Sequence, residues 1–395
     1  MSSRTGAKVP VIDFSNQNLK PSSPEWDLLK FQVREALEEY GCFEASFDQL
    51  LELRQPVLEA LKQLFDLPFQ TKQLCVSDKP LRAYHGSQSR LYDSISTDDA
   101  HIAENIEQYL TTTLWPQGNI SFSKTLASFT QLALGLEKTI LRMILESFGL
   151  EKYMDELVDS TNNHLRAMKY GRPNTSEPTL GIPQHCDNTI LTLLSQLNEV
   201  QGLEIQNKNG EWMNLNPSPN SFVVMLGESF SIWLNGRLSS CYHRVLMEGN
   251  EARYSIGLFA RPRGGYLVKV PKELVDDKNP MLFKPFDLEE FLRTYSPQIV
   301  QERDNISGAK VSVIDFSNQN LKLGSLEWDL LKFQVRGALE EYDYFKASFD
   351  QLLELRQLVL EALKKLFDLP FQTKKVENPF VPMLGVHQDC KRHIH

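Results

Sequence analysis

Apolar residues follow two different periods along this chain, and the change between them marks its main divisions. Over about residues 124–148 they recur every three or four positions, which predicts a long amphipathic helix. The same spacing predicts one helix that starts near Trp26 and stops at Gly41, and another over about 48–65. From 164 to 262, short apolar runs alternate with Gly, Asn and Pro turns, which is typical of antiparallel strands.

The β-rich region contains several candidate strands: His164–Tyr170, Thr189–Ser195, Gly202–Ile205, Trp212–Leu215, Ser221–Leu226, His243–Met247 and Tyr254–Ala260. Such short strands in close series favour an antiparallel sandwich or jelly roll. We therefore predict a mixed α+β fold with a mainly β core and flanking helices. Its expected parts are an N-terminal region over 1–120 and a second region over 121–300 with its core at 160–262.

An internal repeat adds a further part. Residues 6–73 (copy one) recur as 308–375 (copy two) at a constant offset of 302, and 11 of the 68 aligned positions differ. Solenoid repeats have shorter periods and occur in series. A single distant copy indicates a recent partial duplication or a fused gene model. The tail 376–395 has no periodicity and is expected to be irregular.

The two copies differ at a residue that a helix end requires. Gly41 follows the expected helix of copy one, where the chain commonly turns with positive φ. Copy two has Asp343 there, and it also lacks prolines equivalent to Pro10, Pro24 and Pro56. Because a non-glycine residue with positive φ is strained, copy one is better suited to the place this unit occupies in the fold. Copy two is expected to be an appendage.

Composition excludes some functions. A net charge of -9 and a pI near 5.5 argue against nucleic acid or an anionic membrane as the main partner. The five cysteines are odd in number and scattered, which fits a reducing compartment. The start of the sequence has no apolar signal region, and no run approaches 18 apolar residues. We expect a cytoplasmic protein that does not enter a membrane.

The candidate chemistry lies in the β region, where His185 and Asp187 are followed by His243. Two imidazoles and one carboxylate on one face of a metal leave the other face open, as in non-haem Fe(II) oxygenases. A lone His-x-Asp triplet means little, because roughly 0.4 are expected by chance in such a chain. A second triplet, His387-x-Asp389, occurs in the tail. Buried structural histidines are the alternative interpretation.

Arg253 and Ser255 follow ten and twelve residues after His243. Residues at i and i+2 of a strand share a face, and a guanidinium beside a hydroxyl suits a carboxylate. The alternative is a surface arginine and serine on an edge strand. Phe259, on the same expected strand, is either a pocket residue or part of the core.

These segments together resemble a known family. His185-Cys-Asp187, Asn235-Gly-Arg-Leu, Tyr242-His-Arg-Val and Ala252-Arg-Tyr-Ser are similar to the plant 2-oxoglutarate- and Fe(II)-dependent dioxygenases. Met168-Lys-Tyr170, Asn209-Gly-Glu-Trp, Pro217-Ser-Pro, Trp233-Leu-Asn-Gly and Leu282-Phe-Lys-Pro-Phe resemble the glucosinolate side-chain-modifying (AOP-type) subgroup. The resemblance covers roughly residues 8–300 and includes the N-terminal Val-Pro-Val-Ile-Asp-Phe.

The resemblance implies a double-stranded β-helix, or jelly roll, with flanking helices. It assigns His185, Asp187 and His243 to the metal and to catalysis. It assigns Arg253 and Ser255 to the distal carboxylate of 2-oxoglutarate. Tyr170 matches the tyrosine of an Asn-x-Tyr motif that contacts the co-substrate, although the asparagine is Met168 here.

The cofactor implied is Fe(II), with 2-oxoglutarate as co-substrate and ascorbate as a further candidate. The expected partners are dioxygen and a small specialised metabolite, which is hydroxylated, desaturated or dealkylated. The alternative is a catalytically silent family member in which copy two acts as an interaction or domain-swapped module. We expect a monomer, with a swapped dimer as the second possibility.

Overall fold

The computed structural model of the chain describes residues 8–16, 18–86, 91–173, 178–295, 313–315 and 346–348. It separates into two compact units, Met1–Ser296 and Pro297–His395. The tail with His387 and Asp389, and nearly all of copy two, lie outside the described residues.

Local sequence sets the ends of the longer helices. Helix α1 (Pro24–Tyr40) begins after Ser23, whose side chain accepts a hydrogen bond from the Trp26 backbone, and it ends at Gly41 with φ of 67°. The positive φ predicted for Gly41 is therefore confirmed. Helix α2 is Leu50–Phe65. Helix α6 (Ile120–Ser147) is capped by Asn119, so it begins about four residues before its expected start.

The remaining helical segments are short: α3 (Phe69–Lys72), α4 (Ala103–Ile106), a π-helical turn (Glu107–Thr111), α5 (Thr112–Leu114), a 3₁₀ turn (Glu151–Tyr153), α7 (Met154–Asp159), α8 (Glu228–Trp233), a 3₁₀ turn (Lys272–Leu274) and α9 (Leu288–Tyr295).

Two sheets form the centre of the first unit. The large sheet has the order β1 (Val11–Asp13), β2 (Cys42–Ser46), β10 (Ser221–Leu226), β7 (Leu191–Gln196), β12 (Arg253–Pro262), β5 (Thr161–Tyr170), β4 (Tyr92–Thr97) and β3 (Ala83–His85). The small sheet has the order β6 (Thr179–His185), β11 (His243–Met247), β8 (Leu203–Gln206) and β9 (Trp212–Asn214). The strands β13 (Leu267–Val268) and β14 (Phe286–Asp287) pair separately.

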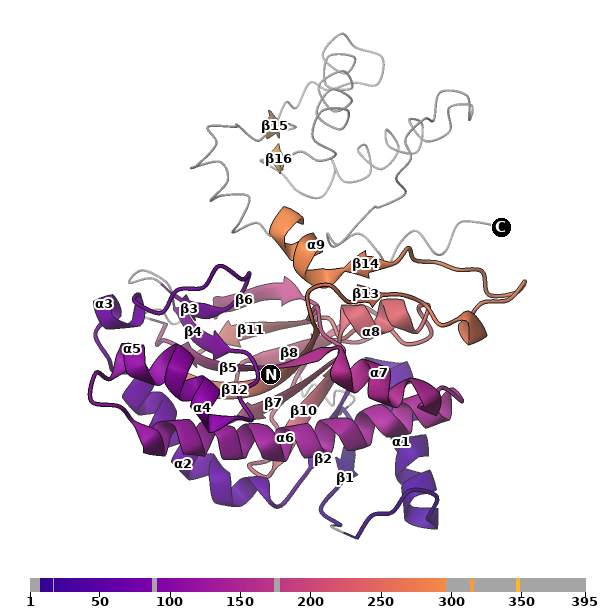
Figure 1. Cartoon of the computed structure of the whole chain (residues 1–395), viewed down its shortest axis with the longest axis horizontal. Helices are drawn as coiled ribbons and strands as arrows, with labels where there is room; N and C mark the ends of the chain where they lie inside the picture. The colour runs from indigo at the N-terminus through magenta and orange to yellow at the C-terminus, as the bar shows by residue number, and fades with distance from the viewer. Residues whose placement is uncertain are drawn as a thin grey trace, which may run out of the picture. The chain divides into compact units, whose positions relative to one another are not determined.

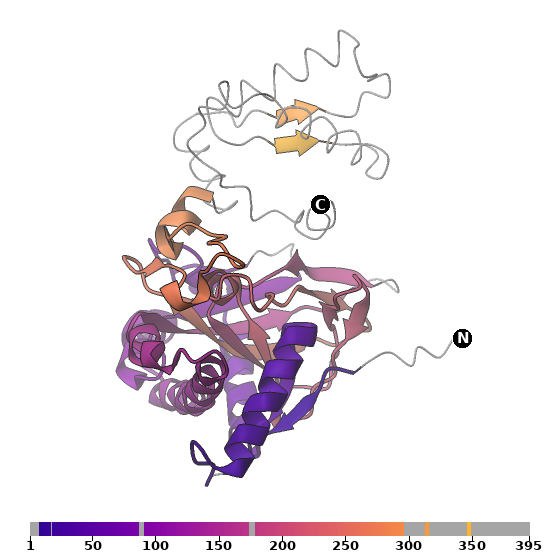
Figure 2. The ribbon, with the colours of Figure 1, turned by 90° about the vertical axis from the view of Figure 1, so that its right-hand side faces the viewer.

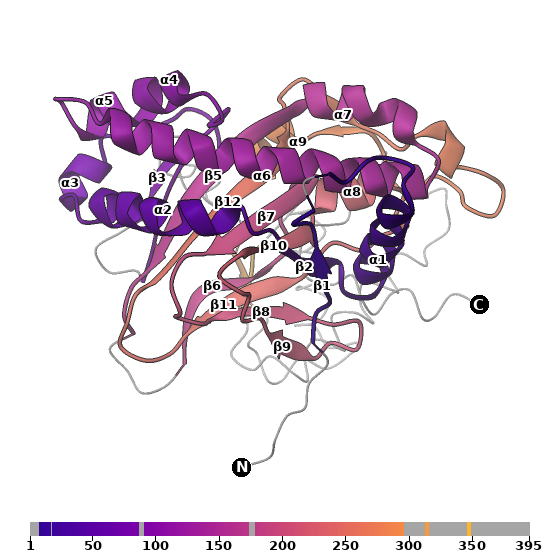
Figure 3. The ribbon, with the colours of Figure 1, turned by 90° about the horizontal axis from the view of Figure 1, so that it is seen from below.

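The first unit is layered, and apolar side chains fill the space between the helices and the large sheet. Helices α2 and α6 cover one face of the large sheet, and the small sheet lies on the other side (Figures 1 and 3). Phe129 of α6 packs on Phe222 of β10 with ring centroids 5.7 Å apart. Ile256 and Leu258 of β12 point toward the same helical layer and are fully buried. The opposite face of β12 carries Arg253 and Ser255, and we call this the inner face.

A mixed helix and strand protein with a β-sheet core is therefore confirmed. The expectation was incomplete, because several strands, such as β3, β4, β6, β13 and β14, were not predicted. Strand β6 contains Gly181 and Pro183, which weaken a strand pattern, and it is tolerated as the edge of the small sheet. Within the described residues, no helix has both the length and the apolar character needed to cross a membrane.

Copy one is built into the large sheet. Its strands β1 and β2 are parallel, with Val11 opposite Glu44, and β2 continues the sheet by pairing antiparallel with β10. Helix α1 lies beside them (Figure 2). In the second unit, β15 (Val313–Asp315) and β16 (Lys346–Ser348) are also parallel, and Val313 is opposite Lys346. This is the β1–β2 register moved by the offset of 302.

Candidate active site

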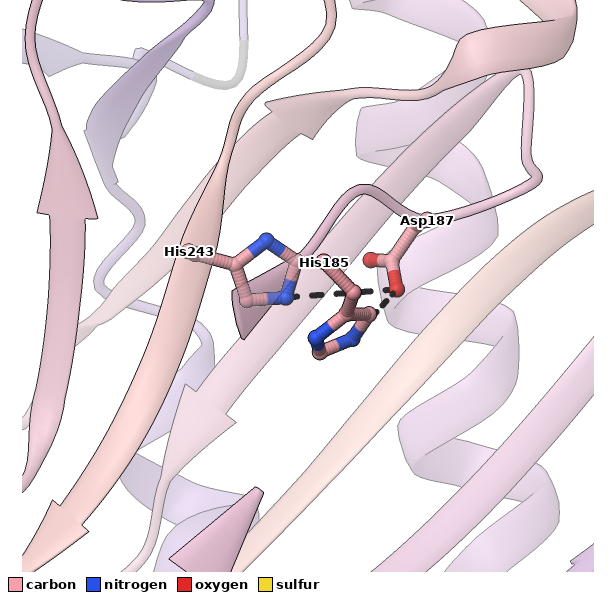
Figure 4. Close-up of side chains that lie close together, drawn as sticks. All are labelled: His185, Asp187 and His243. Carbon is pink, nitrogen blue, oxygen red and sulfur yellow. Dashed lines mark ion pairs between the residues drawn. The ribbon is translucent and has the colours of Figure 1, made fainter. Parts of the chain in front are cut away.

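The two candidate histidines lie opposite each other on neighbouring strands of the small sheet. Strand β6 ends at His185, β11 begins at His243, and the two residues are antiparallel partners with ring centroids 4.3 Å apart. Asp187 follows in the next loop, where its Oδ1 is 3.5 Å from His185 Nε2 and 4.0 Å from His243 Nε2 (Figure 4). One ligand atom from each residue lies within 4.8 Å of the others, so together they could hold one metal ion. We call these three residues, His185, Asp187 and His243, the metal cluster.

A backbone carbonyl two residues upstream orients each imidazole. His185 Nδ1 lies 2.9 Å from the Pro183 carbonyl, and His243 Nδ1 lies 3.1 Å from the Cys241 carbonyl. A proton on Nδ1 donates to the carbonyl and leaves Nε2 as a bare acceptor beside Asp187. A metal-binding histidine is fixed in the same way when its second nitrogen donates to the protein.

Asp187 is held ready as an anion. Thr192 Oγ1 donates to its Oδ2 at 2.7 Å, which leaves Oδ1 facing the two imidazoles. Burial raises the pKa of Asp187, but this is outweighed by His243 and His185 when their rings are protonated and by the Thr192 hydroxyl, so the pKa lies well below its usual range. His185 is the open side of the cluster, because its side chain is 39% exposed while those of Asp187 and His243 are 11% and 7% exposed.

Arg253, Ser255 and Tyr170 form a second group on the inner face of the large sheet. Arg253 Nη1 donates to Ser255 Oγ at 3.3 Å, and Nε donates to Gln196 Oε1 at 3.3 Å. Tyr170 is the strand partner of Arg253, and the guanidinium lies 5.1 Å from its ring centroid. Arg253 Nη2 is buried without a hydrogen-bond partner. A buried guanidinium with a free donor is matched to a carboxylate, which would also offset the lowering of the Arg253 pKa by burial.

The structure places His185, Asp187 and His243 in one group and Arg253, Ser255 and Tyr170 in another. The pair on β12 is buried, with both side chains 0% exposed, so the surface alternative for Arg253 and Ser255 is wrong. Met168 does more than replace an asparagine, because its sulfur accepts from the Tyr170 hydroxyl at 3.8 Å. Cys186 is directed to Ser240, whose Oγ lies 3.2 Å from its sulfur, and it is not a member of the metal cluster.

Sequence reasoning missed the residues that hold this site in place. Thr192 orients Asp187, and Gln196 orients Arg253. Both lie on β7, four residues apart, and so share a face of the strand. That spacing was visible in the sequence. That both side chains lie on the inner face with Arg253 follows only from the register of β7 against β12. Trp233, in a segment that resembles the AOP-type subgroup, is buried against Tyr153 and Phe230.

Comparison with known proteins agrees with this geometry. Residues 161–262 match the model of the 2OG-Fe(II) oxygenase superfamily, and residues 9–118 match the N-terminal model of the non-haem dioxygenases in morphine synthesis. "Probable 2-oxoglutarate-dependent dioxygenase AOP1.2" of Arabidopsis thaliana is 45% identical over 298 residues, which are 74% of this chain and 92% of that protein. The chain belongs to this family. It is a 2-oxoglutarate-dependent dioxygenase that uses Fe(II).

Two further comparisons place the dioxygenase among its relatives. The 2-oxoglutarate-dependent dioxygenase AOP3 of Arabidopsis thaliana is 31% identical, over 73% of this chain and 93% of that protein. The solved complex of the Arabidopsis thaliana dioxygenase for auxin oxidation 1 with 2-oxoglutarate has a TM-score of 0.62 and 25% identity. It covers 69% of this chain and 100% of that one. The predicted family is confirmed.

Proposed function

We propose that the dioxygenase holds its iron through His185, Asp187 and His243. The observation that carries this proposal is the cross-strand pairing of the two imidazoles, with the free Oδ1 of Asp187 between them. The fit is chemical as well as geometric, because an Nδ1 proton on each ring would leave both Nε2 atoms free to bind a metal beside the carboxylate of Asp187. When bound, iron would supply the dioxygen and redox chemistry that protein side chains lack.

Arg253 and Ser255 would hold the distal carboxylate of 2-oxoglutarate, with Tyr170 beside it. All three side chains are at most 2% exposed, so the co-substrate would be bound where water is excluded. Gln196 would keep the guanidinium in place because its Oε1 accepts a hydrogen bond from Arg253 Nε. The chain's own contribution is thus to bind, orient and shield the reacting groups.

The reaction proposed is oxidation of a small specialised metabolite by hydroxylation, desaturation or dealkylation, coupled to decarboxylation of 2-oxoglutarate. Dioxygen is the other partner, and ascorbate is a candidate reductant. We further propose that the two facing sheets are the family's double-stranded β-helix. A monomer in the cytoplasm is proposed, in keeping with four free cysteines among the described residues.

The test is anaerobic addition of Fe(II) and 2-oxoglutarate to the purified protein. We expect the visible charge-transfer band of the iron chelate, and its loss in His185→Ala together with a fall in succinate release of more than about 100-fold. His101→Ala is the matched control, because His101 contacts Asn163 and is outside the metal cluster. No band in the unmodified protein, or a full band in His185→Ala, would refute the assignment.

A catalytically silent interaction module is not favoured by these findings. The metal cluster, the buried arginine and the supporting hydrogen bonds from Thr192 and Gln196 are all present. A silent protein would have no need of the free donor on Arg253. Succinate release that depends on added substrate would exclude the silent alternative directly.

A further inference from the structure

The inner face of the large sheet carries two more arginines beyond the proposed 2-oxoglutarate clamp. Pairing of β12 with β5 places Gly257 opposite Arg166 and Arg261 opposite Asn162. Because partners in an antiparallel pair share a face, Arg166 and Arg261 lie on the same face as Arg253 and Ser255. On β12, Phe259 lies between Gly257, the partner of Arg166, and Arg261. Phe259 also pairs with Thr192, whose hydroxyl donates to Asp187. The two arginines are therefore close to the metal cluster.

Positive charge on this face exceeds negative charge. Arg82 binds both oxygens of Asp98 at 3.1 Å, and His164 Nδ1 lies 2.8 Å from the same carboxylate. Burial lowers the pKa of His164 to about 3, so the ring is neutral and adds no charge. Among the described residues, neither Arg166 nor Arg261 forms an ion pair within 4 Å. Asp98 thus balances only one of the three guanidinium groups.

Burial and the excess positive charge together lower the pKa of Arg261. Arg261 is 4% exposed, and its pKa is lowered to about 9, mainly by burial and then by the charges of Arg82 and Arg166. The proposed co-substrate site does not supply the missing anion. Fe(II), Asp187, the dianion of 2-oxoglutarate and Arg253 sum to zero charge, so the excess from Arg166 and Arg261 remains.

Polar atoms without partners lie beside Arg166. Ser94 and His85 are partners of each other across β3 and β4, and Ser94 is also opposite Met168, which puts both on the inner face. The side chain of Ser94 is 1% exposed and its hydroxyl has no hydrogen-bond partner. Arg166 Nε and His85 Nε2 are likewise buried and unpartnered. Buried polar groups are nearly always satisfied in proteins, so such a group of orphans points to a ligand.

Two side chains on the inner face of β5 and β12 are partly exposed. Arg166 and Phe259 are half-buried, whereas their inner-face neighbours Met168, Ser255 and Gly257 are buried. The Arg166 guanidinium lies 5.8 Å from the centroid of the Phe259 ring. An apolar ring and a cation therefore stand side by side at the accessible part of the sheet. That combination suits a ligand with an apolar body and an anionic end.

Resting on the proposed oxygenase function, we propose that the primary substrate is a small organic acid whose anionic oxygens bind Arg166, with Arg261 adding positive potential. A carboxylate and a sulfate share the required chemistry. The apolar part would lie against Phe259 and be presented to the metal cluster. Ser94 and His85 would complete the hydrogen bonds around the anion. Arg166 is then a specificity-determining residue for the reaction.

The test uses two probes of equal shape and different charge, benzenesulfonate and benzenesulfonamide. Each is titrated calorimetrically into the anaerobic protein with Fe(II) and saturating 2-oxoglutarate, so that Arg253 is already occupied. We expect benzenesulfonate to bind at least about tenfold more tightly, because only it forms charge-assisted hydrogen bonds. Arg166→Gln should abolish this preference, Arg166→Lys should restore part of it, and Arg261→Gln should reduce it.

Arg263→Gln is the matched control, because Arg263 lies just beyond β12, is 42% exposed and pairs with Asp99. It should keep the preference for the anion. Equal affinity for the two probes, no binding of either, or a preference that survives Arg166→Gln would overturn the proposal. The charge-transfer band measured in each variant separates the two hypotheses. Loss of the band in the unmodified protein refutes the iron site, while the probe comparison judges the anion site.

Discussion

Copy one and copy two are nearly the same sequence, yet only copy one suits the position it occupies in the large sheet. Three of the 11 differences fall where copy one contacts the rest of the catalytic unit: Gly41 to Asp343, Cys42 to Tyr344 and Glu44 to Lys346. Cys42 is 0% exposed, so the larger tyrosine would overfill its site. The fit of a duplicated segment therefore depends on a few contact residues and not on overall identity.

These contacts also reach the metal site. A Cβ on Gly41 would lie 2.8 Å from the Ser239 carbonyl and 3.2 Å from the Cys241 nitrogen. Cys241 supplies the carbonyl that orients His243. Copy one thus supports the segment that leads into a proposed iron ligand, and a change at its contacts should affect both stability and activity.

The largest effect is expected for Glu44→Lys, which places the copy-two residue in copy one. Glu44 is 7% exposed and accepts hydrogen bonds from the Ser218 backbone and the Ser221 hydroxyl, both at 2.8 Å. A lysine would bury a cation against donors, at a cost of about 3–5 kcal/mol in the free energy of unfolding. Denaturant unfolding measures it. Glu44→Gln keeps an acceptor and should cost about 1 kcal/mol; a similar loss for both variants would contradict this account.

A smaller loss, about 2–3 kcal/mol, is expected for Gly41→Asp, because left-handed backbone strain adds to the contact with Ser239. Gly149→Asp is a matched control, since Gly149 has the same φ of 67° and no atom within 4 Å of an added Cβ. It should lose only the strain, about 1 kcal/mol. Gly41→Asp should also weaken the charge-transfer band through His243, and equal effects of the two substitutions would show that the Ser239 contact is unimportant.

One copy-two residue is expected to stabilise copy one when it is introduced there. Ser22 is exposed and has φ of 66°, a conformation that favours glycine, and copy two has Gly324 at this position. Ser22→Gly should raise the free energy of unfolding by less than about 1 kcal/mol, since relief of strain is partly offset by a more flexible unfolded chain. Thermal unfolding of the variant against Ser23→Gly, which loses the α1 cap, tests the sign. A destabilised Ser22→Gly would show that the positive φ costs nothing there.

The sequence predicted the reacting residues better than their supports. Arg253 and Ser255 were found because neighbours at i and i+2 on a strand share a face, and His185 and Asp187 were found as a short His-x-Asp triplet, so both signals are local. Arg166 and Ser94 come together only through the pairing of β4, β5 and β12, which local pattern does not encode. Strand β4 was missed for the same reason, because its Tyr-Asp-Ser-Ile-Ser-Thr sequence has little apolar alternation and is positioned by β5.

The smallest effect is expected when copy two is removed altogether. If the residues at 343, 344 and 346 exclude copy two from the site of copy one, a chain ending at Gln301 should unfold within about 0.5 kcal/mol of the full chain. Its succinate release should be unchanged, because copy one already supplies α1, β1 and β2. The full and the shortened chain should each elute at the volume expected for a monomer. Domain swapping predicts instead a concentration-dependent dimer that the truncation abolishes. Size-exclusion chromatography over a hundredfold range of concentration distinguishes the two, and a dimer seen only in the full chain would mean that copy two can enter the sheet despite Lys346.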